Sequence, residues 1–536
     1  MGCKTLKIGV FFDGTGNNAL FDSSDGRDQQ SNIAKLYALY KRDEFEREDG
    51  TKVTAKSIYV KGIGTYDTQE EYDAHPIVRK YDKGGGGGGA KRIEDAIKQV
   101  TAILDANPYG NKKEQYRSRL IDVFGFSRGA ALARDFVNTF YWKIQNKYPQ
   151  YNDVCFNFIG IYDTVGSFGK PGNNIDMKSR FPELFDEDSI DIFEGNLSED
   201  YGIVDHNRTD KILTAKKLFQ KEDEAQKFAK KLRDKGAKAN VAPYYPLSLL
   251  GPLLFPAGYI VTAQIKEYDE QGVGAYVPYN FNLCMQSAKK IVHMTAHDEV
   301  RKNFPLTNIK GSGGLETSML GVHSDVGGGY APVKMERHEF PYRGHYRRVR
   351  KAAKRKAKEL SSRGGIWHVE SAHCARNGIG SFVLLREVIN DLSNVTLNLM
   401  YEQAVSCQVD FEPMPQDENH AVLPSLEGYY AYAGEHLINA YTYAQTDDGA
   451  YLAERQRHHS AVDPAGKSTH YAGNTSLIED VWKRDSADGG GNDARYVDRY
   501  GREVDGREYP ELAVRVERAV FDNNQDRAVR PKESNN

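Results

Sequence analysis

Short apolar runs alternate with longer helix-compatible segments over the first 170 residues, and the pattern returns near residue 320. The apolar runs have the length of buried strands and lie at residues 7–12, 57–60, 119–126, 155–162 and 318–322. Helices are predicted between them at residues 27–41, 91–104 and 130–136. Strands that alternate with helices predict an α/β fold, in which a mostly parallel sheet has helices on both faces.

The remaining segments suggest how the chain is organised. Residues 1–170 and 264–420 are predicted to form the core, with 421–520 packed on it, and 171–263 form a cap or lid inserted over the site. A dense basic helix is predicted at 343–360, and amphipathic helices at 382–392 and 396–405. The last residues, 521–536, are expected to form a flexible tail.

Composition excludes several classes of protein. A hydrophobic content of 39% in 536 residues is enough for a large core, so the chain should be globular. A net charge of -3 gives no global basic field, and nucleic acid is not an expected partner. The five cysteines are odd in number and contain no C-x-x-C pair, which predicts free thiols in a reducing cytoplasm and no zinc site.

The N-terminus runs into a strand without the apolar region of a secretory signal peptide. No uninterrupted apolar run is long enough to span a bilayer, since the nearest one, 246–263, is broken by Pro252 and Pro256. We therefore expect the protein to be made in the cytoplasm and, if exported, to need a machine other than the general secretory route.

The most informative motif is Gly125-Phe126-Ser127-Arg128-Gly129, which follows an apolar strand and precedes a helix. This is the context of a nucleophile elbow, a sharp turn that exposes a serine hydroxyl above a sheet. Glycines flank the serine because such a turn leaves no room for a β-carbon two residues away. An ordinary strand–helix turn with a capping serine is the alternative. Ser127 is our candidate nucleophile.

A serine hydroxyl needs a base within hydrogen-bond reach and a carboxylate that orients the base. Asp163 and His323 each follow an apolar strand, and the chain order Ser127, Asp163, His323 is that of α/β-hydrolases. The fold is therefore predicted to be α/β-hydrolase-like. Other histidines compete for the role of base, namely His206, His293, His297, His458 and His459, and Asp205 and Asp325 are alternative acids.

Metal and phosphate chemistry are not supported by the motifs. His293 and His297 have i,i+4 spacing but lack the intervening glutamate of a zinc-protease helix, and we expect no metal or cofactor. The hexaglycine 84–89 is not followed by Gly-Lys-Ser/Thr, so a mobile loop is favoured over a phosphate site.

An oxyanion hole needs two preorganised donors, each contributing about 3 kcal/mol. One is expected from the backbone N–H of Arg128, directly after the nucleophile, and the other from Gly14 or Thr15 in the loop after the first strand. A phosphatase signature at the same loop fails, because Phe11 stands where the first aspartate is required.

Four motifs together resemble a known family: Phe11 to Asn18, Gly125 to Ala130, Tyr162 to Gly166 and Gly321 to Tyr330. They are similar to the family of α/β-hydrolases that contains the first class of type VI secretion lipase effectors. The resemblance implies a Ser127–Asp163–His323 triad and phospholipase A cleavage of glycerophospholipid esters in a competitor's membrane. It also implies a phospholipid membrane, a type VI spike or carrier protein and a cognate immunity protein as partners.

Two surfaces could contact that membrane. In the cap, Leu253, Leu254 and Phe255 could face lipid or could belong to a buried core element. The basic helix could attract anionic headgroups, dock a partner protein, or simply be solvated. The functions that compete with a phospholipase are a soluble carboxylesterase for small substrates and a hydrolase-fold binding module whose serine is idle.

Overall fold

The computed structural model describes residues 4–19, 30–65, 89–110, 115–166, 212–234, 238–244, 258–266, 279–299, 301, 304–457, 495–497, 514–516, 518, 520–523, 525 and 528–531. The hexaglycine residues 84–88 and residues 246–257 of the apolar segment 246–263 lie outside these residues, whereas Gly89 begins a described helix.

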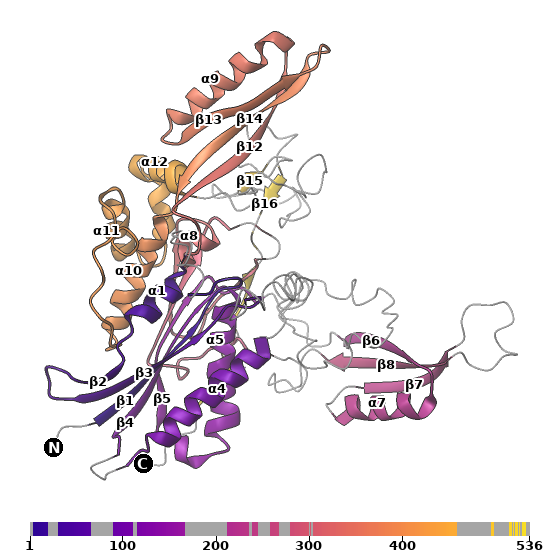
Figure 1. Cartoon of the computed structure of the whole chain (residues 1–536), viewed down its shortest axis with the longest axis vertical. Helices are drawn as coiled ribbons and strands as arrows, with labels where there is room; N and C mark the ends of the chain where they lie inside the picture. Colours follow the sequence, from indigo (N-terminus) through magenta and orange to yellow (C-terminus); the bar gives the residue numbers. More distant parts are fainter. Residues whose placement is uncertain are drawn as a thin grey trace, which may run out of the picture.

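A seven-stranded sheet forms the centre of the protein (Figure 1). Its strands, in spatial order, are β11 (Leu315–Met319), β9 (Lys290–Ala296), β5 (Val154–Tyr162), β4 (Ser118–Phe126), β1 (Lys4–Phe12), β3 (Lys52–Val60) and β2 (Asp43–Glu46). All neighbouring pairs are parallel except β2–β3 at the edge. The carboxyl ends of six strands therefore meet at one edge of the sheet.

Helices cover both faces of this sheet. On one face α4 (Gly89–Ala106) and α5 (Arg128–Thr139) pack on Leu6, Ile8, Val10 and Phe12 of β1. On the other, α1 (Asn32–Leu39) and α10 (Leu392–Val405) share a core with Phe11. Both faces of β1 are apolar because both are buried, as expected for a central parallel strand. The predicted fold class is confirmed.

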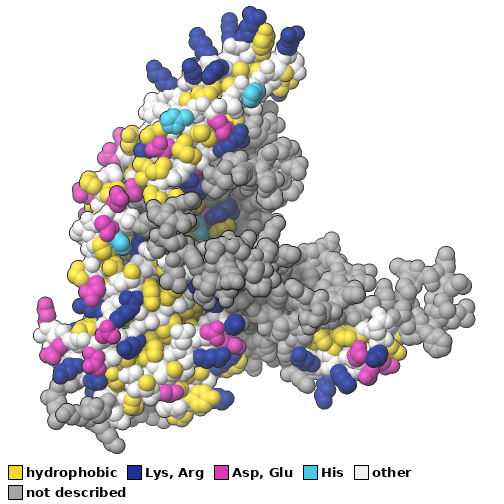
Figure 2. All heavy atoms as spheres, in the orientation of Figure 1, with side chains coloured by type: hydrophobic (Ala, Val, Ile, Leu, Met, Phe, Trp, Pro, Cys, Tyr) yellow, Lys and Arg dark blue, Asp and Glu magenta, His cyan; other side chains and the backbone are white. Residues whose placement is uncertain are grey.

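Two smaller α+β units are separate from this sheet. Within residues 171–263, β6 (Ile212–Phe219), β8 (Gly258–Lys266) and β7 (Lys238–Tyr244) form an antiparallel sheet beside α7 (Glu222–Asp234). In the second unit, α9 (Val349–Ser361) packs on the sheet of β12 (Val333–Arg343), β14 (Ile379–Ile389) and β13 (Ile366–Cys374). Figure 2 shows lysine and arginine side chains gathered over α9.

One predicted helix is wrong. Residues 382–389 of the predicted helix 382–392 belong to β14, which pairs with β12 on one side and β13 on the other, and Leu392 begins α10. Phe382 and Leu384 face the core under α9, whereas Val383 lies between them on the opposite side of the strand. This period of two, together with the two ladders of backbone hydrogen bonds, overrides the helical spacing that the apolar residues also satisfy.

The remaining described elements are short. They are α8 (His323–Gly327), α11 (Glu427–Glu435), α12 (Asp447–Gln456), β15 (Arg495–Val497), β16 (Val514–Val516) and the turns of helix Phe140–Gln145, Pro149–Tyr151, Tyr346–Arg348, Pro424–Leu426 and Ala440–Gln445. Within the part of the chain that the structure describes, no helix is both long enough and apolar enough to cross a membrane.

The described part of the predicted flexible tail packs on the core. β17 (Val520–Phe521) pairs in parallel with β10 (Leu306–Thr307), and the Val529 N–H donates to Asn138 Oδ1 at 2.7 Å. The Asn523 side chain also donates to the carbonyl oxygen of Leu283 at 2.8 Å. Backbone groups that would otherwise be unpaired are satisfied in this way, which explains why these residues do not form a free end.

Candidate active site

Ser127 lies at a strained turn between β4 and α5. Its backbone φ and ψ are 60° and -127°, a conformation that residues other than glycine rarely adopt. A β-carbon at Gly129 would lie 2.4 Å from the carbonyl oxygens of Phe12 and Asp13, and one at Gly125 would lie 2.6 Å from the Ala130 Cα. The glycines are therefore required by space, as expected for a nucleophile elbow.

The backbone of Ser127 forms hydrogen bonds with residues before and after Asp163. The Ser127 N–H donates to the Tyr162 carbonyl at 3.0 Å, and the Val165 N–H donates to the Ser127 carbonyl at 3.2 Å. β4 and β5 are parallel neighbours, so their carboxyl ends deliver the serine and the aspartate side by side. Asp163 also has a positive φ, 38°.

His323 joins the same edge from the start of α8. Its Nδ1 lies 2.5 Å from Asp163 Oδ2, and its ring packs on Phe126 and against the edge of Phe304, with centroid distances of 4.6 and 4.8 Å. If Nδ1 carries the proton that Asp163 accepts, Nε2 holds the lone pair of a base. No hydrogen bond between Ser127 Oγ and His323 occurs in the described structure; such bonds commonly tighten only when substrate binds.

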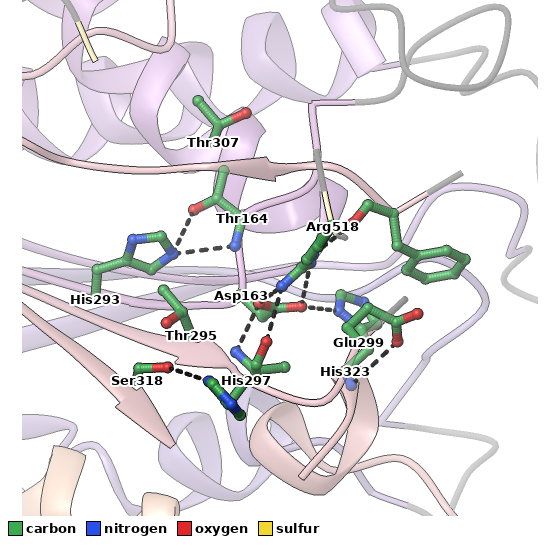
Figure 3. A network of polar contacts seen from close by, with 12 residues as sticks. Asp163, Thr164, His293, Thr295, His297, Glu299, Thr307, Ser318, His323 and Arg518 are labelled. Carbon is green, nitrogen blue, oxygen red and sulfur yellow. Dashed lines mark hydrogen bonds and ion pairs between the residues drawn. The ribbon is translucent and has the colours of Figure 1, made fainter. Parts of the chain in front are cut away.

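Asp163 is the hub of a polar network (Figure 3). Arg518 donates to both of its carboxylate oxygens, at 2.7 Å to Oδ1 and 2.8 Å to Oδ2, and the Ala296 N–H donates to Oδ1 at 2.8 Å. Burial opposes ionisation of Asp163, but the Arg518 charge and the His323 hydrogen bond hold its pKa well below its usual range. Sequence reasoning missed Arg518.

A second buried carboxylate, Glu299, supports the histidine. It accepts a hydrogen bond from the His323 backbone N–H at 3.3 Å and two from the Arg301 side chain at 2.9 Å. Despite burial, the Arg301 charge lowers the pKa of Glu299 to about 2. Burial lowers the pKa of His323; its hydrogen bond with Asp163 opposes this shift, and the Arg301 charge adds to it.

The alternative histidines and acids that the structure describes have other contacts than a catalytic base or acid would need. His293 Nε2 accepts from the Thr164 N–H at 3.1 Å while Nδ1 bonds Glu316 at 2.8 Å, so both ring nitrogens are committed. The His297 ring stacks on Tyr441 at 3.6 Å. The Asp325 carboxylate accepts from the Val322 N–H at 2.9 Å. The remaining alternatives, His206, His458, His459 and Asp205, lie outside the described residues.

The loop after β1 contains the second predicted oxyanion donor. The Gly14 N–H donates to Asp13 Oδ1 at 2.7 Å, which makes it a poorer donor for a substrate. Asp13 is itself held by Ser31 and Tyr59, at 2.6 and 2.5 Å. By contrast, the Thr15 hydroxyl is buried and has no hydrogen-bond partner among the described residues. Arg128 begins α5, where backbone N–H groups point out of the helix.

The predicted lipid contacts cannot be placed in the same way. Leu253, Leu254 and Phe255 lie outside the described residues.

Comparison with known proteins gives one family match. Residues 7–141 match the sequence model described as type VI secretion system, phospholipase effector Tle1-like, catalytic domain. This segment contains the loop of Gly14 and Thr15 and the elbow of Ser127, whereas Asp163 and His323 lie beyond it. The predicted resemblance to type VI secretion lipase effectors is confirmed, and this segment is similar to the catalytic domain of a lipid ester hydrolase.

Two solved structures are also similar. One is titled "Structure of the Tle1 effector bound to the VgrG spike from the Type 6 secretion system", with 19% identity, 97% of this chain and 94% of that chain covered, and a TM-score of 0.47. The other is a crystal structure of an uncharacterized protein from Pseudomonas aeruginosa, with 16% identity, 81% and 51% covered, and a TM-score of 0.36. None of the curated proteins matches the chain.

Proposed function

We propose that this chain is a serine phospholipase of the A type, with Ser127 as nucleophile, His323 as general base and Asp163 as the carboxylate that orients the base. The observation that supports this most is the 2.5 Å contact between His323 Nδ1 and Asp163 Oδ2 beside the strained turn of Ser127. The match of residues 7–141 to a phospholipase catalytic domain supports the lipid substrate.

In this mechanism the Ser127 hydroxyl attacks an acyl ester carbonyl while His323 Nε2 takes its proton. Asp163 stabilises the imidazolium that forms and does not itself become protonated, in keeping with its lowered pKa. The negative oxygen of the tetrahedral intermediate accepts hydrogen bonds from the backbone N–H groups of Arg128 and Thr15. His323 returns its proton to the leaving alcohol, and a water molecule then hydrolyses the acyl-enzyme by the same steps.

The biological role that fits this chemistry is an antibacterial effector. We propose that the protein is made in a bacterial cytoplasm, carried by a type VI spike or carrier protein, and neutralised in the producing cell by an immunity protein. Its target is then the phospholipid of a competitor's membrane. The family match over residues 7–141 supports delivery by this system.

A vesicle assay tests the proposal directly. Phosphatidylethanolamine and phosphatidylglycerol, each with different acyl chains at sn-1 and sn-2, are incubated with the protein and with the Ser127→Ala variant. Release of one fatty acid by the wild type alone supports a phospholipase A and identifies the ester. Equal release by both proteins would contradict the role of Ser127. Hydrolysis confined to short soluble esters would instead indicate a carboxylesterase.

We further propose that residues 171–263 act as a cap whose Leu253, Leu254 and Phe255 contact lipid. The double change Leu253→Asp with Phe255→Asp should then reduce activity on vesicles far more than on a short soluble ester, because only interfacial burial is lost. If the segment is core, both activities and the melting temperature fall together. A stable variant with normal vesicle activity would reject the lipid contact.

A further inference from the structure

Arg518 belongs to the C-terminal segment but its side chain lies in the network around Asp163. Besides its two bonds to the carboxylate, it donates to the Phe304 carbonyl at 2.7 Å and to the Ala296 carbonyl at 3.1 Å. The side chain is only 8% exposed. All three nitrogen atoms of the Arg518 side chain thus donate to fixed acceptors. The two hydrogen bonds to Asp163 have the bidentate geometry that a guanidinium forms with a carboxylate.

The segment that carries Arg518 is attached next to it. β17 pairs with β10, and the Asn308 N–H donates to the Phe521 carbonyl at 3.0 Å. β10 in turn reaches the loop of the candidate acid, because the Thr307 N–H donates to the Thr164 carbonyl at 3.0 Å. A continuous set of backbone bonds therefore connects the residue after Asp163 with the segment of Arg518.

We infer that Arg518 is a positioning residue of the active site, and that the C-terminal segment completes a catalytic unit begun by residues 127 and 163. This inference rests on the proposed triad. Asp163 Oδ2 accepts from both His323 and Arg518, so the guanidinium fixes the plane of the carboxylate and, through it, the ring of the base. It also keeps a fully buried carboxylate ionised, as the orientation of His323 requires.

Three variants test this role on vesicles and on a soluble ester: Arg518→Ala, Arg518→Lys and, as control, Arg530→Ala. Arg530 belongs to the same C-terminal segment but is exposed. The Arg530→Ala control therefore removes one positive charge, as Arg518→Ala does, without removing a buried contact. We expect Arg518→Ala to lower kcat about 10²-fold at unchanged KM, because a displaced base costs about that much. Addition of millimolar guanidinium should restore part of the rate, and Arg530→Ala should behave as wild type.

The pH profile separates positioning from a purely structural role. Loss of a cation near His323 should raise its pKa, so the acid limb of kcat in Arg518→Ala moves to higher pH. Arg518→Lys retains the charge but loses the bidentate contact, and its kcat should fall about 10-fold with an unshifted limb. This second variant decides the question if Arg518→Ala does not fold.

Two results would overturn the inference. One is a wild-type kcat and pH profile in Arg518→Lys together with full activity in Arg518→Ala. The other is a folded Arg518→Ala with reduced activity that guanidinium does not restore and whose acid limb is unshifted. Ser127→Ala distinguishes the two levels of proposal: if that variant is active the triad fails, whereas an inactive Ser127→Ala beside a fully active Arg518→Ala rejects only the role of Arg518.

Discussion

Two histidine–carboxylate pairs lie at neighbouring places in this protein, and only one has the features of a catalytic base. His323 bonds Asp163 at 2.5 Å, and His293 bonds Glu316 at 2.8 Å, in both cases through Nδ1. Both rings are buried. The pairs differ at the second nitrogen, because His293 Nε2 accepts the Thr164 N–H whereas His323 Nε2 has no such partner among the described residues. A carboxylate partner alone therefore does not identify a base.

The position of each histidine in its element explains the difference. His293 lies inside β9, where its buried ring bonds Glu316 on the neighbouring strand β11 and Thr164 just after β5. His323 begins α8, a few residues after the end of β11, so its ring is at the edge where Ser127 and Asp163 meet. Catalytic side chains of open parallel sheets are found at such carboxyl-terminal edges.

The largest expected effect is on the rate. Ser127→Ala and His323→Ala should each lower kcat about 10⁶-fold, because members of a triad act as a unit. The folded fraction of His293→Ala should have a kcat within about tenfold of the wild-type value. Phospholipid hydrolysis at saturating substrate measures this contrast. The comparison breaks if His293→Ala is the inactive variant and His323→Ala is not.

Removal of the Asp163 carboxylate should likewise lower kcat more than removal of the Glu316 carboxylate. Asp163→Asn should lower kcat about 10⁴-fold, because an amide favours the wrong tautomer of His323. Glu316→Gln should leave kcat within about tenfold, since its partner does not act on substrate. Steady-state kinetics of both variants, with circular dichroism to verify folding, makes the check. Similar losses in the two would mean that the pairs are functionally equivalent.

Loss of stability should be larger for His293→Ala than for Ser127→Ala, which is the reverse of their order in kcat. His293→Ala leaves the buried Thr164 N–H without its acceptor and removes the partner of Glu316, so it should lower the free energy of unfolding by about 2–4 kcal/mol. Ser127→Ala should change it by less than about 1 kcal/mol, because the hydroxyl makes no packing contribution. Denaturant unfolding measures both. A neutral His293→Ala would show that its two bonds are dispensable.

The smallest effect is a shift along the pH axis. His323 must be neutral to act as a base, and its lowered pKa means that activity persists below pH 6.5 and is lost as pH falls through the folded-state value. Stability follows a separate window. Glu299, with a pKa of about 2, stabilises the fold above its unfolded pKa of about 4.3, and this contribution is lost as pH falls toward 2. A kcat/KM profile whose acid limb lies above pH 6.5 would contradict the first statement.

The sequence predicts the site where local pattern and chemistry coincide. Ser127 is found because a strand, two glycines and a helix surround it, and Asp163 and His323 because each follows an apolar run. Glu299 and Arg518 carry no such signal, since their roles depend on contacts that only the folded chain creates. For most of β14 the apolar spacing predicts a helix, and this prediction is wrong because its strand pairing is decided by tertiary partners. The cap of 171–263 and the lipid contacts in it stay predictions.

The contact between Asp163 and Arg518 spans 355 residues, and this separation has a consequence for the time at which the protein becomes active. At a synthesis rate of 5–20 residues per second, the ribosome needs roughly 18 to 71 seconds to pass from one residue to the other. During that interval the nascent chain contains Ser127 and Asp163, gains His323 part of the way through, and still lacks the arginine. If Arg518 is needed for full activity, as inferred above, the nascent chain stays a weak enzyme until its C-terminal segment has been synthesised and has folded against Asp163.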